Sequence, residues 1–82
     1  MASNVDRLRD LLTEVFLLEP NQFRLDLRRE QVDTWDSLGM VALAVGLEQT
    51  FGHHLPPDEV VALGGVPDIV AALSRRGVSF DG

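Results

Sequence analysis

The sequence contains no cysteine and no lysine, and it has no long hydrophobic run. Without cysteine, the chain can form neither a disulfide framework nor a thiolate metal site. No stretch approaches the roughly 20 apolar residues that a membrane-spanning helix needs. No basic segment followed by an apolar run indicates a secretory signal. We therefore expect a cytoplasmic protein that does not associate with membranes.

The balance of charge is acidic, with 13 acidic residues against 7 basic residues, all of them arginine, and a formal net charge of -6. A negative surface repels the phosphates of nucleic acids and anionic lipids, and it steers the protein toward basic partner surfaces. Nucleic acid is therefore not expected as a partner. The same acidity can also serve only to keep a small protein soluble.

The 82 residues suffice for one domain, residues 1–82, with one modest core. A domain of this size buries only about 60–65% of the surface of its unfolded chain, which leaves little room for a deep substrate cleft. Its hydrophobic fraction of 45% and charged fraction of 24% are ordinary for a globular domain. We expect a free-standing, monomeric module that docks onto other proteins, and not an enzyme.

The hydrophobic periodicity is helical, and no segment alternates as a strand does. It predicts an all-α fold, a small bundle of three main helices and one short helix. The predicted helices cover residues 4–18, 37–51, 58–63 and 66–76. Ser3 and Asp6 form a capping-box pattern before the first helix, and Pro20 is expected to stop it.

The long connection over residues 19–35 is unusual, because loops of more than about 12–15 residues are uncommon and often functional. Four apolar residues are expected to hold this loop on the helices: Phe23, Leu25, Leu27 and Val32. Trp35 is expected to anchor the end of the loop against the start of the second helix, since an indole buries a large apolar area.

The start of the second helix combines a cap with a reactive side chain. Asp36 is a strong N-cap candidate, which places Ser37 in the first turn. A side chain there lies beside unpaired backbone amides and the positive end of the helix dipole, where a phosphate is stabilised. The ordinary explanation of such a serine is purely structural, because serine is common at helix starts.

The second helix carries no charge from Leu38 to Leu47. A helix that is apolar all round is either central to a core or exposed to partners, and four short helices cannot wrap one of their number completely. Leu43 and Leu47, with Phe51, are predicted to lie in the core. The predicted docking residues are Asp36, Leu38, Val41 and Val45. The alternative is that Leu38 and Val41 lie beneath the long loop.

A family resemblance rests on this helix. Asp36-Ser37-Leu38 is a weak signal alone, but its place at the helix start and the residues downstream make it specific. The downstream residues are Val41, Leu43, Leu47, Glu48, Phe51 and Gly52. The region resembles the phosphopantetheine attachment region of acyl carrier proteins and peptidyl carrier domains. The resemblance covers nearly the whole chain, including the short helix at Pro57-Asp58-Glu59 and the final helix.

The resemblance implies a function for Ser37 as a covalent attachment point, with no catalytic residue in the chain. A phosphopantetheinyl transferase would move 4'-phosphopantetheine from coenzyme A onto its hydroxyl, and the thiol of this arm would hold a cargo as a thioester. It also implies that the second helix and the preceding loop bind partner enzymes. The partners expected are the transferase and the enzymes that load and process the cargo.

The sequence departs from the carriers of fatty acid synthesis, which usually have acids just after the serine and midway along the helix. Here the matching positions are Gly39 and Ala42, and only Glu48 is acidic. The resemblance therefore favours a specialised pathway, such as polyketide or nonribosomal peptide synthesis, that handles an acyl, aminoacyl or similar unit. A carrier of fatty acid synthesis remains an alternative, as does a helical adaptor that carries no cargo and in which Ser37 is only structural.

The two histidines, His53 and His54, follow the second helix directly. No further ligand cluster accompanies them, so no metal site is predicted. A catalytic triad with Ser37 is excluded, because a helix of about fifteen residues, roughly 22 Å long, separates them. Both are expected to be surface loop residues, with a contact to the arm or its cargo as the alternative.

Overall fold

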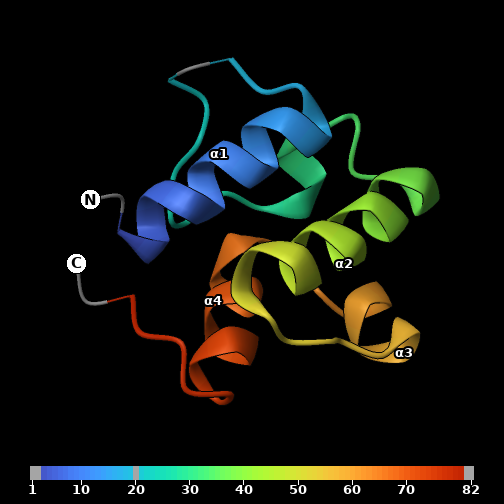
Figure 1. Cartoon of the computed structure of the whole chain (residues 1–82). Coiled ribbons are helices and arrows are strands. Elements are labelled where there is room, and N and C mark those ends of the chain that lie inside the picture. Colours follow the sequence, from blue (N-terminus) through green and yellow to red (C-terminus); the bar gives the residue numbers. More distant parts are fainter. Residues whose placement is uncertain (1–2, 20, 81–82) are drawn as a thin grey trace.

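The computed structural model describes residues 3–19 and 21–80 of the chain and contains four α-helices (Figure 1). The helices are α1 (Asn4–Phe16), α2 (Ser37–Phe51), α3 (Pro57–Val61) and α4 (Val66–Ser74), and a 3-10 helix, η1 (Arg29–Gln31), lies between α1 and α2. The described residues form no strand. The expected all-α bundle of three longer helices and one short helix is confirmed.

The first helix begins as predicted but ends earlier. The Ser3 hydroxyl accepts a hydrogen bond from the Asp6 amide at 3.1 Å, and Asp6 accepts one from the Ser3 amide at 3.4 Å. The end predicted at Leu18 is wrong, because Leu17 takes a left-handed conformation (φ 56°) that stops α1 at Phe16. Pro20, which was expected to stop the helix, lies outside the described residues.

The two C-terminal helices are also shorter than predicted. The third begins at Pro57, whose fixed φ suits a first helical turn, and it ends at Val61. The fourth ends at Ser74 and not at residue 76, because the amides of Arg76 and Gly77 bond back only three residues, in a tighter 3-10 turn. Arg76, which follows α4, links the two helices by hydrogen bonds to both carboxylate oxygens of Glu59 in α3, at 2.6 and 3.1 Å. This hydrogen bonding lowers the pKa of the Glu59 carboxyl.

The core lies where α1, α2 and α4 meet. Each of the three helices contributes one buried stripe, as the 3.6-residue periodicity predicts. The buried residues of these helices are Leu8, Leu12, Phe16, Met40, Leu43, Leu47, Val66, Ile69, Ala72 and Leu73. α1 and α2 lie above α4 in the view of Figure 1, whereas α3 lies below the first half of α2.

The long loop is held on the helices by some of the residues predicted to do so. Leu27 and Val32 are buried, and Phe23 is partly buried against the core. The prediction for Leu25 is wrong, because its side chain is 50% exposed. Trp35 is buried and its ring stacks on Phe16, with ring centroids 4.7 Å apart, so the end of the loop is anchored on α1, whereas the prediction placed the anchor at the start of the second helix.

Two backbone hydrogen bonds also join the loop to the start of α4. The Val66 amide donates to the Leu27 carbonyl at 2.8 Å, and the Arg29 amide donates to the Gly64 carbonyl at 2.9 Å. Gly65, the N-cap of α4, lies between these two bonds. A Cβ atom at Gly65 would lie 2.6 Å from the Leu27 carbonyl oxygen, so only glycine permits this close approach.

We expect Gly65→Ala to lower the free energy of unfolding by about 1–3 kcal/mol, because two backbone segments would have to move apart. Urea unfolding followed by the fluorescence of Trp35, the single tryptophan, measures this loss. Gly64→Ala is the matched control, since a Cβ there would meet only the flexible Asp68 carboxylate, at 3.0 Å. Equal losses in the two variants would contradict the steric explanation.

Candidate functional site

Ser37 is the first residue of α2, and its side chain is exposed. The predicted cap is confirmed: Asp36 Oδ1 accepts a hydrogen bond from the Gly39 amide at 2.9 Å. The cap therefore does not use the Ser37 hydroxyl, and no described residue forms a hydrogen bond with that hydroxyl. Its oxygen is available both to solvent and to the active site of another protein.

The segment before Ser37 is held firmly on the end of α1. The Thr34 hydroxyl donates to the Phe16 carbonyl at 2.7 Å, and Trp35 stacks on the Phe16 ring. These contacts place the start of α2 against the last turn of α1. Ser37 thus lies at a packed corner between two helices, although it follows a long loop.

The same corner explains why Gly39 has no side chain. A Cβ atom there would lie 2.6 Å from the Thr34 carbonyl oxygen and 2.7 Å from Cε1 of Phe16. An acidic residue just after the serine would therefore separate α2 from α1. The glycine at this position is a packing requirement of this chain, whatever its consequence for partner choice.

The two faces of α2 are divided as predicted. Leu43 and Leu47 are fully buried, whereas Leu38, Val41 and Val45 are 82%, 64% and 53% exposed. The long loop does not cover these exposed residues, so that alternative is wrong. Phe51 is only partly buried and contacts the ring of Phe80, with centroids 6.0 Å apart.

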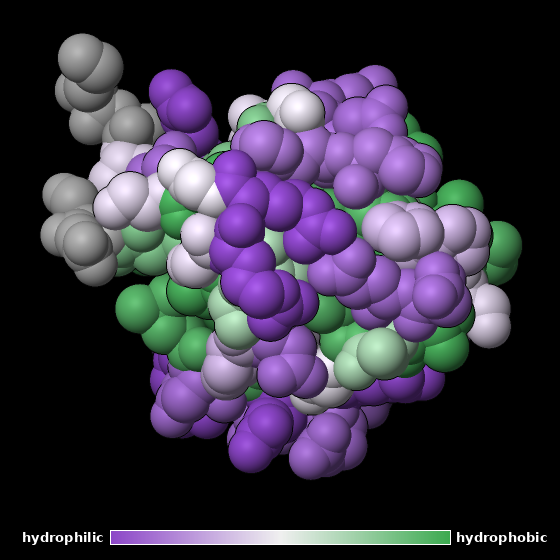
Figure 2. Space-filling view, turned by 90° about the horizontal axis from the view of Figure 1, so that it is seen from below, coloured by the Kyte–Doolittle hydropathy of each residue, from purple (hydrophilic) through white to green (hydrophobic). Residues whose placement is uncertain are grey.

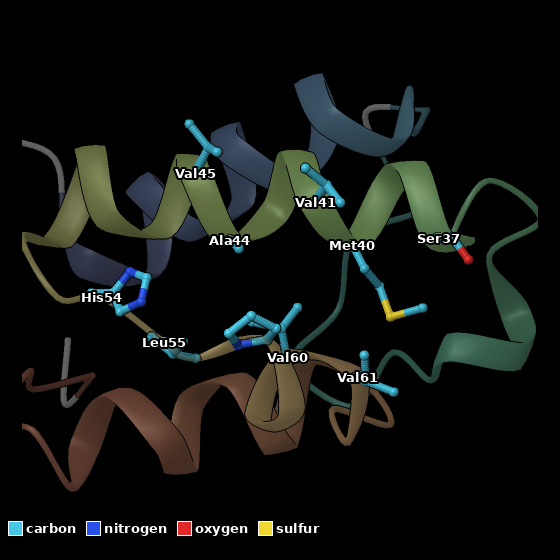
Figure 3. Close-up of a pocket in the computed structure, with 10 residues that line it drawn as sticks. Ser37, Met40, Val41, Ala44, Val45, His54, Leu55, Val60 and Val61 are labelled. Atoms are coloured by element: carbon cyan, nitrogen blue, oxygen red, sulfur yellow. The ribbon is translucent and has the colours of Figure 1, made fainter.

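An apolar groove of about 360 Å³ runs between α2 and the segment that contains α3 (Figure 3). Its volume falls at the lower end of the range of about 300–1,000 Å³ typical of small-molecule sites. Ser37 lies at one end and His54 at the other. The groove is lined by Ser37, Met40, Val41, Ala44, Val45, His54, Leu55, Pro57, Val60 and Val61.

The groove changes the interpretation of the predicted docking residues. Val41 and Val45 line it, whereas Leu38 does not. Seen from below, hydrophobic side chains reach the surface on the side where α2 and α3 lie, while most of the face shown is hydrophilic (Figure 2). Leu38 thus belongs to a surface beside Ser37, and the two valines belong to the wall of a cavity.

The groove was not predictable from the sequence. Its far wall is formed by Leu55, Val60 and Val61, and only the turn after α2 brings these residues opposite α2. The available signal was Gly52, which adopts a left-handed conformation (φ 74°) and reverses the chain there. The sequence showed that turn but not the distance between the segments on either side of it.

The described residues offer little else that could carry chemistry. No three histidine, aspartate or glutamate side chains among them are grouped so that they could hold a metal ion. His54 is paired through Nδ1 with Oε1 of Glu48 at 2.8 Å. No helix in residues 3–19 and 21–80 is long and apolar enough to cross a membrane.

Compared with protein families, with curated proteins and with solved structures, the chain gives no match.

Proposed function

We propose that this protein is a carrier that holds 4'-phosphopantetheine on Ser37 and bears an acyl, aminoacyl or similar small unit on it as a thioester. One observation carries the proposal: the Ser37 hydroxyl is exposed, is not used by the helix cap, and stands at the end of an apolar groove. The resemblance of the Asp36-Ser37-Leu38 region to carrier proteins supports the same conclusion.

The residues around Ser37 suit the attachment reaction. Ser37 Oγ would form a bond to the β-phosphorus of coenzyme A, the phosphoanhydride bond would break, and adenosine bisphosphate would leave. The hydroxyl proton would pass to a base of the transferase. The bound group supplies a thiol, which this chain lacks. The first-turn amides of α2 would stabilise the resulting phosphodiester. Of these, the Gly39 amide already donates a hydrogen bond to the Asp36 carboxylate.

The surface beside Ser37 favours partners with an apolar contact over partners that rely on a basic groove. Leu38 is 82% exposed, and the neighbouring positions Gly39 and Ala42 carry no charge. Buried apolar anchors contribute much of the affinity at protein interfaces. We therefore assign the carrier to a specialised pathway, such as polyketide or nonribosomal peptide synthesis, rather than to fatty acid synthesis.

Intact mass measurement tests the proposal. The purified protein is incubated with coenzyme A and a phosphopantetheinyl transferase of broad specificity, and we expect a gain of one phosphopantetheine. No gain with several transferases would contradict the carrier function. That result would favour a helical adaptor, whose exposed α2 docks a partner without modification.

A separate prediction concerns Leu38, which is one of the predicted docking residues. We expect Leu38→Ala to slow transfer by roughly five- to tenfold, the effect of losing one apolar anchor at an interface. The free energy of unfolding should change by less than about 0.5 kcal/mol, because the side chain is exposed. The measurement is the rate of loading as a function of protein concentration.

Leu17→Ala is the matched control for this prediction, since it truncates a leucine that is 79% exposed and lies outside both α2 and the long loop. It should load at the rate of the unaltered protein. An equal slowing in both variants would show that exposed leucines act nonspecifically, and it would contradict a docking role for Leu38.

A further inference from the structure

The groove described above has only two polar side chains in its lining, Ser37 at one end and His54 at the other. All the other lining residues are apolar. Such a wall cannot satisfy amide or hydroxyl groups, and burying one without a partner costs free energy. The middle of the groove therefore suits hydrocarbon, and a polar group would find a partner only at an end (Figure 3).

His54 is held in a defined way at the end far from Ser37. Its Nδ1 lies 2.8 Å from Oε1 of Glu48, in the last turn of α2. A carboxylate can only accept hydrogen bonds, so in the neutral ring Nδ1 carries the hydrogen and Nε2 is left as an acceptor. The His54 side chain is 72% exposed, and Glu48 is its only hydrogen-bond partner among the described residues.

We propose that His54, oriented by Glu48, selects a cargo whose chain is apolar along its length and ends in a hydrogen-bond donor, a hydroxyl or an amine. This inference rests on the carrier function proposed for Ser37. The arm lies outside the groove, because its amides would find no partner among the apolar walls. The walls take the cargo chain, and Nε2 accepts the hydrogen bond of its terminal group. When the chain ends in a methyl group, Nε2 of His54 can accept a hydrogen bond only from water.

The test compares cargoes of equal length on the whole protein. Phosphopantetheine arms that bear a hexanoyl or octanoyl group, or the same chains with a terminal hydroxyl, are transferred to Ser37 from the corresponding acyl-coenzyme A thioesters, so that each cargo stays on the arm as its thioester. The rate at which hydroxylamine cleaves each thioester reports how far the groove protects the cargo. Nitrogen-15 chemical shifts of the His54 ring give a second readout, independent of cleavage.

At the chain length that reaches His54, we expect the hydroxyl-terminated cargo to be cleaved roughly three to ten times more slowly than its methyl-terminated counterpart, the effect of one net hydrogen bond. The His54 Nε2 signal should shift only with the hydroxyl-terminated cargo. His54→Leu should abolish the difference, because the hydroxyl then meets an apolar end. Glu48→Gln should keep most of it, since an amide oxygen still accepts from Nδ1.

His53→Leu is the matched control and should retain the full difference between the cargoes. Equal protection of the two cargoes at both lengths would overturn the role of His54 while leaving the carrier function intact. Better protection of a carboxylate-terminated chain would overturn the assignment of Nε2 as an acceptor. Failure of Ser37 to accept any of these groups would instead contradict the carrier function.

Discussion

Ser37→Ala is expected to abolish loading completely, so that its intact mass stays unchanged after incubation with coenzyme A and a transferase. Among the residues that line the groove, only Ser37 has a side-chain oxygen. The free energy of unfolding should change by less than about 0.5 kcal/mol, because the side chain is exposed and Asp36 caps α2. Intact mass and urea unfolding measure the two effects separately.

Two further variants show whether the loss of loading is specific to the Ser37 hydroxyl. Ser74→Ala removes another exposed helical serine, from α4, and should load fully. Asp36→Ala retains the Ser37 hydroxyl but removes the cap, which should cost about 1 kcal/mol of stability. Continued loading of Ser37→Ala would place the modification elsewhere. Unfolding of Ser37→Ala would show that the serine is structural and would favour the adaptor.

The second large effect is expected from Leu47→Ala, which should lower the free energy of unfolding by about 2–5 kcal/mol. Leu47 is fully buried in the core, and truncating it would leave a cavity between the helices. A chain of this length has a total stability of only about 4–12 kcal/mol. The variant could therefore lose much of its folded population, which urea unfolding followed by Trp35 fluorescence would show.

Leu38→Ala is the matched control for the core, because it removes the same atoms from the same helix. Leu38 is 82% exposed, so its truncation leaves no cavity. The two variants should therefore separate stability from docking: Leu47→Ala affects the first and Leu38→Ala the second. Similar losses of stability in both would contradict the division of α2 into a buried and an exposed face.

Features set by short-range rules were predictable from the sequence. The caps at Ser3 and Asp36 depend on hydrogen bonds across three residues, and both are present. The burial of Leu47 and the exposure of Leu38 follow from helical periodicity and from the small size of the chain. Helix ends were less predictable, because a single left-handed residue such as Leu17 can stop a helix without glycine.

By itself, the sequence determined the number and order of the helices, the serine at the start of α2 and the two apolar faces of that helix. Each depends on residues within a few positions of one another. The tertiary structure alone decided that Gly39 and Gly65 leave no room for a side chain, and that one groove joins Ser37 to His54. These features depend on the packing of segments distant in the chain, and local hydrogen bonds and periodicity do not specify that packing.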